Sequence, residues 1–431
     1  MGINCDLVVQ NGRVCTPSGL LSLDIWIKDG RIAMLGGPNH AEERIDASGM
    51  LVLPGAIDLH VHFRDPGPNY KEDWASGSLA AAAGGVTTVV DQPNTEPRTL
   101  DARSFEQKLD IARHRSVVDF CLNGGPGNIR ELADGGATAI GEIFTYEHSD
   151  QDLQRILAET KEAGLLPTIH AEDGKTVSDS TSGLQDRHDP EVYSVARPAK
   201  AEALAIEKVL SWSDRLHICH LSTIQGLNQV AEARVRGKKV SCEVAPHHLF
   251  FSVKDYHRLG SFLKMNPPLR RKEDNDALWE GLRTGSIDIL ASDHAPHLPE
   301  EKREDIWEAP AGVPGVETML PLMLHAVRRN LISLERLVES LSAGPARIFG
   351  LQSKGAIMPG KDADLVIVDT KDIRTINADR LHSRADWTPY EGMQAMFPQM
   401  TLVRGTLVWN GDLQVRYGCG RFQGRLRQKA L

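Results

Sequence analysis

Between about residue 50 and residue 345, the chain alternates short apolar runs with longer amphipathic stretches. Near-continuous hydrophobic strands separated by helix-length segments are typical of parallel β/α units, because both faces of such strands are buried. The apolar runs lie at 51–61, 86–91, 116–122, 137–144, 165–170, 215–221, 239–245 and 286–292. Eight strands close a (β/α)8 barrel, so we expect an α/β fold with a TIM-like barrel over residues 54–350.

The two ends of the chain show a different pattern. Residues 6–36 alternate in short β-like pieces, and the segments 363–369 and 401–409 repeat this style after the barrel. Short alternating runs bounded by turn residues predict antiparallel strands. We therefore expect a small β-sandwich domain formed by both termini, residues 1–53 and 351–431.

Composition places the chain among ordinary globular proteins. It is 41% hydrophobic and 25% charged, which excludes a mostly disordered chain, a collagen and a coiled coil. The net charge is −9, with no basic block and no long apolar run, so we expect neither nucleic-acid nor membrane binding. The six cysteines show no C-x-x-C spacing, and the first residues lack the layout of a signal peptide. These features predict free thiols in a cytoplasmic protein.

Histidines and acids gather where the predicted strands end. In a β/α barrel the active site lies at the C-terminal face of the strands, so residues far apart in sequence meet at one rim. Six residues occupy such positions: His60, His62, Glu142, His170, His220 and Asp293. Their recurrence at one rim favours a metal site over isolated core histidines.

The His60-x-His62 pair predicts two imidazoles on one face of a strand. Such a pair alone is weak evidence, but the other strand ends supply further ligands. Imidazole and carboxylate ligands suit Zn²⁺, with Mn²⁺ or Co²⁺ as substitutes, and we expect one or two zinc ions. A divalent ion makes bound water acidic, and Asp293 is placed to pass a proton to a leaving nitrogen. The alternative for Asp293 is a role as a ligand or helix cap only.

Several motifs together closely resemble the dihydroorotases of the amidohydrolase superfamily. They are "PGAIDLHVHFRDPG" (54–67), "DQPNTEP" (91–97), "HAED" (170–173), "CHLST" (219–223), "CEVAPHHL" (242–249), "KMNPPLR" (264–270), "SDHAPH" (292–297) and "GVPGVET" (312–318). A further motif, "PGKDADLVIVD" (359–369), resembles that superfamily's return to its small β domain. The motifs follow in order over almost the whole chain, which makes chance agreement an untenable explanation.

The resemblance implies hydrolysis of the cyclic amide of dihydroorotate to N-carbamoyl-L-aspartate, and the reverse cyclisation in pyrimidine biosynthesis. It implies that His60 and His62 bind a first metal together with Asp293, which also acts as the catalytic acid/base. It implies that His170 and His220 bind a second metal. It also implies a set of substrate-binding groups: Arg64, Asn94, Asn266, His297, and the backbone of Pro314 and Gly315.

The chemistry of these side chains agrees with the implied substrate. Dihydroorotate is an anion, so an acidic protein needs a locally positive pocket for it. Arg64 offers a planar bidentate fork to a carboxylate, and His297 adds a donor. Asn94 and Asn266 can donate to and accept from ring amides, although either can instead be a turn residue.

One segment departs from the superfamily pattern. Many members bridge two metals with a carboxylated lysine at the end of the fourth strand, but "GGATAIGEIFTYEHS" (135–149) contains no lysine. Glu142 is the carboxylate in the corresponding place. Our hypothesis is that Glu142 bridges two zinc ions directly or ligates one, and its shorter reach leaves the metal number open.

Other interpretations stay open at this point. An allantoinase- or hydantoinase-type cyclic amidase would share the metal histidines, and a non-catalytic partner of aspartate transcarbamoylase would be expected to have lost them. A homodimer or an association with aspartate transcarbamoylase is the expected quaternary state. The segments 174–198 and 298–315 are candidates for a loop that closes over the site.

Overall fold

The computed structural model describes residues 4–37 and 39–424, and eight parallel strands at its centre form a closed barrel. Two bridges complete the ring: Gly124 pairs with Ile140, and Val61 pairs with His294. The strands are β8 (Ala56–Val61), β9 (Val86–Asp91), β10 (Asp119–Leu122), β11 (Ile140–Phe144), β12 (Pro167–His170), β13 (Arg215–Ile218), β14 (Lys239–Val244) and β15 (Ile289–Leu290). The predicted (β/α)8 barrel is confirmed.

One helix after each barrel strand packs around the outside of the ring. These helices are α1 (Trp74–Ala83), α2 (Ala102–Arg115), α3 (Ile129–Gly135), α4 (Asp150–Glu162), α7 (Ala199–Trp212), α8 (Ile224–Val235), α11 (Lys272–Thr284) and α13 (Met319–Arg328). In α4, Leu153, Ile156 and Leu157 are buried at helical spacing, and the Ser149 side chain caps the first turn. The amphipathic stretches of the sequence therefore face the barrel with their apolar sides.

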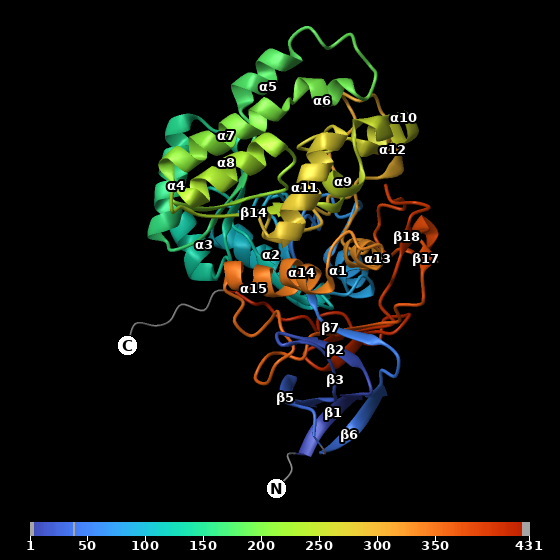
Figure 1. Ribbon diagram of the computed structural model, residues 1–431. Coiled ribbons are helices and arrows are strands. Elements are labelled where there is room, and N and C mark those ends of the chain that lie inside the picture. The colour runs from blue at the N-terminus through green and yellow to red at the C-terminus, as the bar shows by residue number, and fades with distance from the viewer. Residues whose placement is uncertain (1–3, 38, 425–431) are drawn as a thin grey trace.

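Shorter helices complete the loops. They are α5 (Gly174–Thr181), α6 (Val192–Ala196), α9 (Pro246–Phe250), α10 (Tyr256–Leu259), α12 (Pro299–Lys302), α14 (Leu334–Val338) and α15 (Gly344–Phe349). In Figure 1, α5 and α6 lie at one end of the barrel and the small β-sheets lie at the other end. Because α5 follows the C-terminal end of β12, the end with α5 and α6 is the end where barrel active sites form.

Two packed sheets form the small β-sandwich. One has the order β5-β4-β1-β6 and is entirely N-terminal; the other has the order β20-β19-β16-β7-β2-β3 and combines strands from both ends of the chain. Their bounds are β1 (Asn4–Gln10), β2 (Arg13–Thr16), β3 (Gly19–Ser22), β4 (Ile25–Lys28), β5 (Arg31–Leu35), β6 (His40–Asp46), β7 (Leu51–Pro54), β16 (Leu365–Val368), β19 (Met400–Val403) and β20 (Thr406–Trp409). The prediction of a small β domain built by both termini is confirmed. Its proposed boundaries at 53 and 351 stay predictions, and residues 1–3 and 425–431 of those ranges lie outside the described residues.

The apolar run 51–61 is two strands, not the single barrel strand that we expected. β7 belongs to the sandwich and β8 to the barrel, and Gly55 separates them. The Gly55 N–H donates to the carbonyl of Asp364, and a β-carbon at Gly55 would collide with the Thr87 side chain. The chain therefore passes between the two units at a residue where the Thr87 side chain leaves no space for a β-carbon.

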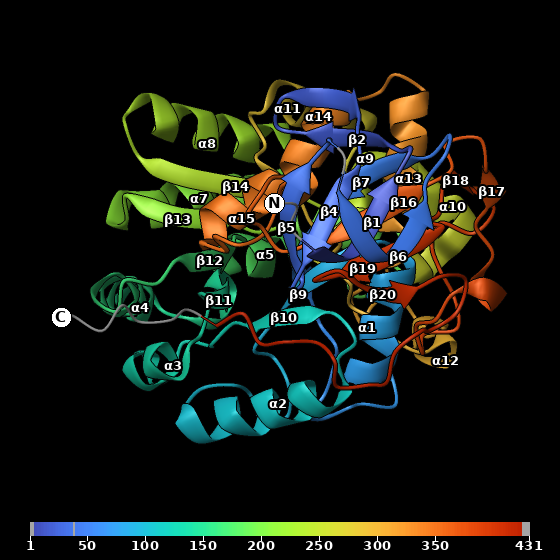
Figure 2. The same cartoon turned by 90° about the horizontal axis from the view of Figure 1, so that it is seen from below.

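Two C-terminal segments return to the barrel. The arm at residues 373–396, with the short strands β17 (Arg374–Thr375) and β18 (Gln394–Ala395), buries Tyr390 against Phe251 and Val313. Further on, Phe422 pairs with Phe120, so the last described residues run beside β10 (Figure 2). The C-terminal part of the chain thus contacts the barrel as well as the sandwich.

Two simpler expectations concern cysteines and membranes. All six cysteines are free thiols, as predicted, and all except Cys419 are buried. In the described part of the chain, every helix is too short or too polar to span a bilayer.

Candidate metal centre and active site

All six predicted ligands lie together at the C-terminal ends of the barrel strands, and all six are buried. His60, Glu142 and His170 stand on β8, β11 and β12, whereas His220 and Asp293 follow the ends of β13 and β15. His220 and Asp293 have positive φ values of 29° and 47°. Strained backbone at non-glycine residues is typical of functional sites, where it aims a side chain.

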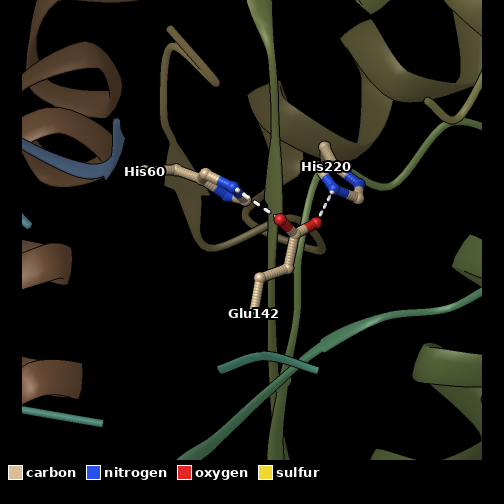
Figure 3. Close-up of side chains that lie close together, drawn as sticks. All are labelled: His60, Glu142 and His220. Atoms are coloured by element: carbon tan, nitrogen blue, oxygen red, sulfur yellow. Dashed lines mark hydrogen bonds and ion pairs between the residues drawn. The ribbon is translucent and has the colours of Figure 1, made fainter. Parts of the chain in front are cut away.

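The carboxylate of Glu142 lies at the centre of this group. Its Oε1 is 2.6 Å from Nε2 of His220 and 2.8 Å from Nδ1 of His170. Its Oε2 faces the other way, 3.4 Å from Nε2 of His60 and 3.9 Å from Nε2 of His62. Figure 3 shows the two oxygens directed at His60 and His220. Oε2 thus faces a first histidine pair, His60 and His62, and Oε1 contacts a second pair, His170 and His220. A bridging ligand requires this arrangement.

The first histidine pair has the spacing of metal ligands. Asp293 Oδ1 lies 3.3 Å from His62 Nε2 and 3.6 Å from His60 Nε2. Two ligand atoms on one tetrahedral zinc ion, each about 2.0–2.2 Å from it, lie about 3.3–3.6 Å apart. His60 Nε2 is buried and has no hydrogen-bond partner within the described residues. Both His60–His62–Asp293 and His60–Glu142–His220 are buried groups that could hold a cation, so together the clusters are consistent with a binuclear metal site.

The electrostatics of the site favour positive charge. Burial alone would raise the pKa of Glu142, but His60, His170 and His220 outweigh burial and hold this pKa well below its usual range. Burial likewise opposes ionisation of Asp293, yet the close contact with His62 and the nearby His60 and His220 lower the pKa of this carboxyl. Both carboxylates are therefore ionised near neutral pH and available to a metal.

Two further groups, Glu243 and Asn94, orient the predicted ligands, a role that the sequence indicated for neither. His60 donates from Nδ1 to Glu243 Oε1 at 2.6 Å, and His62 donates from Nδ1 to Asn94 Oδ1 at 2.8 Å. Each bond leaves Nε2 free to face the site, as carboxylate–histidine pairs do around metals. Asn94 was expected to bind substrate, but in the structure its Oδ1 accepts the hydrogen bond from His62, a predicted metal ligand.

The second pair has its own support. His170 donates from Nε2 to Glu172 Oε2 at 2.7 Å, and Arg197 donates from Nε to the same carboxylate at 3.0 Å. Burial would raise the pKa of Glu172, but Arg197 and His170 lower it. One sequence feature could have identified Glu172 as the partner of His170. It lies two residues after His170 in the "HAED" motif.

Strand alternation would place the Cys219 side chain on the face opposite to His220, away from the site. Its Sγ instead lies within 4.8 Å of ligand atoms of both His60 and Glu243. Strand β13 ends at Ile218, so the alternation rule no longer applies at residue 219.

The predicted anion-binding pair lies together. Arg64 Nη2 is 3.3 Å from His297 Nε2, and the buried Nε of Arg64 has no hydrogen-bond partner in the described part of the chain. Arg64 is half-buried and adopts a positive φ of 59°. An unpaired buried donor on a guanidinium beside a histidine forms a natural site for a carboxylate.

Asn266 and Gly315, two of the remaining predicted substrate-binding residues, make hydrogen bonds within the protein. Asn266 Oδ1 accepts a 2.6 Å hydrogen bond from the Tyr193 hydroxyl. The Gly315 N–H donates to His294 Nδ1 at 3.0 Å, and the Gly315 carbonyl accepts from Met319 N. A substrate contact through the backbone of Gly315 would have to replace one of these bonds, and the neighbouring Pro314 has no N–H. Their binding roles stay predictions.

The chain matches known proteins over nearly its full length. Residues 51–408 match the amidohydrolase family. A dihydroorotase of Methanosarcina acetivorans is 46% identical, over 97% of this chain and 95% of its own. An allantoinase of Rubrobacter xylanophilus is 38% identical, over 98% of both chains. The solved structure of the L-hydantoinase from Arthrobacter aurescens superposes with a TM-score of 0.94 at 34% identity, covering 98% of this chain and 100% of the other.

The closed barrel, the histidine–carboxylate centre and these matches define one class of protein. The chain belongs to the amidohydrolase family. Within that family it is a dihydroorotase-like, metal-dependent cyclic amidohydrolase.

Proposed function

We propose that this protein interconverts dihydroorotate and N-carbamoyl-L-aspartate. Four relatives at 41–46% identity are named dihydroorotases. The observation that carries the substrate assignment is the Arg64–His297 pair, with its unpaired guanidinium donor beside Asp293 and the metal ligands. Dihydroorotate has a ring carboxylate for this pair, whereas allantoin and hydantoin have none.

The centre that we propose holds two zinc ions, for which Mn²⁺ or Co²⁺ could substitute. His60, His62 and Asp293 would hold one ion, His170 and His220 the other, with Glu142 as the bridge. Bound there, divalent cations lower the pKa of water and polarise a carbonyl group. The support is the ligand spacing around His60 and the division of the two Glu142 oxygens between the histidine pairs.

The residues of the chain then have separate tasks. Arg64 and His297 bind the substrate carboxylate and thereby fix the ring against the metal ligands. The Asp293 carboxylate takes a proton from the attacking water. As the C–N bond breaks, Asp293 returns this proton to the leaving ring nitrogen, and in the cyclisation direction it carries the proton the opposite way.

The decisive experiment compares turnover of dihydroorotate, allantoin and hydantoin by metal-replete protein, with metal quantified in the same sample. We expect the highest kcat/KM for dihydroorotate, and loss of that preference in Arg64→Met. Equal or better turnover of allantoin would overturn the substrate assignment. Asp293→Asn should retain metal yet lower kcat by about 10²–10⁴-fold, the usual contribution of a general acid/base; a wild-type rate would contradict its role.

A non-catalytic role is less well supported. Such a protein has no need of the predicted ligands, yet here all six are present, buried and gathered at one rim. A homodimer, an association with aspartate transcarbamoylase and a cytoplasmic location remain our proposals. Sedimentation of the protein alone and mixed with aspartate transcarbamoylase would test the first two.

A further inference from the structure

Lys71 contacts the ring nitrogen of His297 that faces away from Arg64. Its Nζ lies 3.1 Å from His297 Nδ1 and 2.6 Å from Glu301 Oε1. The side chain is only 12% exposed. At the other ring nitrogen, Nε2, His297 lies 3.3 Å from Arg64 Nη2 and 3.1 Å from the carbonyl of Ala311.

The donor and acceptor chemistry of these contacts determines the state of the ring. A lysine ammonium group has three donors and no acceptor, so Nδ1 of His297 must accept from Lys71. Burial, together with Arg64 and Lys71, holds the pKa of His297 far below its ordinary range, which makes the ring neutral. A neutral imidazole that accepts at Nδ1 carries its hydrogen on Nε2, the nitrogen beside Arg64.

We propose, on the basis of the function above, that Lys71 is a positioning residue that holds His297 in the Nε2–H tautomer, so that this ring donates to the substrate carboxylate. Two donors, Arg64 Nη2 and His297 Nε2–H, then lie 3.3 Å apart. Only an acceptor can satisfy both, and a carboxylate does so with its two oxygens. In the free protein the Ala311 carbonyl accepts from Nε2 and keeps the ring in place.

Glu301 and its neighbours hold Lys71 rigidly. While Glu301 Oε1 pairs with Lys71, its Oε2 accepts from the backbone N–H of Leu298 at 2.9 Å, at the start of α12. The next residue, Lys302, is fully buried and donates to the carbonyls of Lys264, Pro310 and Gly312 at 2.8–3.0 Å. The segment that carries Glu301 is therefore anchored, and the position of Lys71 depends on buried bonds.

A double-mutant cycle tests whether Lys71 acts through His297. Because a charge-assisted hydrogen bond contributes about 1.5–3 kcal/mol, we expect Lys71→Met to raise KM for dihydroorotate about 10- to 100-fold with kcat and metal content nearly unchanged. Lys71→Arg, which is also donor-only, should retain most of the affinity. Lys28→Met, an exposed change in the sandwich, is the matched control.

The second arm of the cycle decides between mechanisms. In a His297→Ala background, Lys71→Met should have almost no further effect, because the ring through which it acts is gone. Full additivity of the two effects would show that Lys71 contacts the substrate itself and would overturn the proposal.

Nitrogen-15 NMR of the histidine rings provides a test that needs no turnover. The signal of His297, assigned from its loss in His297→Gln, should report the Nε2–H tautomer in the substrate-free wild-type protein. Lys71→Met should shift the ring toward the other tautomer or its protonated form. An Nδ1–H tautomer in the wild type would refute the inference. Absence of dihydroorotate turnover by the wild type, with the Nε2–H tautomer present, would refute only the proposed function.

Discussion

Asn94 accepts a 2.8 Å hydrogen bond from the Nδ1–H of His62, across 32 residues of sequence. The resemblance to dihydroorotases implied a substrate-binding role for this asparagine. The observed bond instead fixes which nitrogen of His62 faces Asp293, because a ring that donates from Nδ1 presents its lone pair at Nε2. The same side chain can thus control metal binding whether or not its amide also reaches the substrate.

We expect Asn94→Ala to weaken metal retention by about 10- to 100-fold, the usual effect of removing the partner of a metal-ligating histidine. Competition with a chelator measures this directly. Asn94→Asp keeps an acceptor for His62 and should retain metal better. Unchanged metal affinity with a raised KM would assign Asn94 to the substrate alone.

The sequence predicted the barrel and the set of strand-end residues because both follow from local rules. Burial on both faces produces apolar runs, and the carboxyl ends of parallel strands converge on one rim. His60, His170 and Asp293 could therefore be grouped without coordinates. Their grouping is a matter of strand number and direction, and neither depends on side-chain packing.

The orienting groups could not be predicted in this way. Glu243 supports His60 across 183 residues, and Lys71 contacts His297 across 226. Such pairs depend on which side chains of non-neighbouring elements happen to reach each other, and spacing along one strand contains no such information. For the same reason, the sequence did not reveal that Tyr390, in the predicted β domain range, packs on the barrel.

A buried ion cluster joins the barrel to the sandwich. Lys354 Nζ lies 2.8 Å from Asp119 Oδ2 on β10, 2.6 Å from Asp364 Oδ2 and 3.3 Å from Asp362 Oδ2. All four side chains are buried. Removing one partner of a buried ion pair leaves uncompensated charge and typically destabilises by about 3–5 kcal/mol.

Lys354→Met should therefore lower the free energy of unfolding by about that amount, measured from urea transitions. The control is Lys371→Met, since that lysine is exposed and its side chain makes no ion pair within the described residues. Equal stability of the two variants would show that the cluster contributes nothing to folding.

His382 and Glu317 provide a pH-dependent contact. His382 donates from Nδ1 to Glu317 Oε1 at 2.8 Å, and this hydrogen bond raises the pKa of His382 above 6.5. A histidine whose pKa is higher in the folded than in the unfolded protein stabilises the fold. This stabilisation is complete below the unfolded pKa of about 6.5 and disappears as pH rises through the pKa in the folded protein. On the acid side, burial raises the pKa of Glu317, so its protonation weakens the pair there.

We expect the Tm difference between wild type and His382→Gln to be largest near the unfolded pKa of about 6.5 and to shrink as pH rises through the raised pKa of His382 in the folded protein. Thermal unfolding at several pH values gives the comparison. A difference that stays constant over this range would show that charge on His382 does not stabilise the fold.

The proposed bridging role of Glu142 predicts what the apo-protein needs for reconstitution. A carboxylated lysine forms only with carbon dioxide, whereas Glu142 already presents a carboxylate to His60, His170 and His220. We expect activity to return on addition of Zn²⁺ alone, in buffers stripped of bicarbonate. Glu142→Ala should bind fewer zinc ions per chain and lose activity. Glu147→Ala, which removes a carboxylate that pairs with Arg98 at the surface, should keep both metal and activity. A bicarbonate requirement in the wild type, or unchanged zinc content in Glu142→Ala, would remove Glu142 from the bridge.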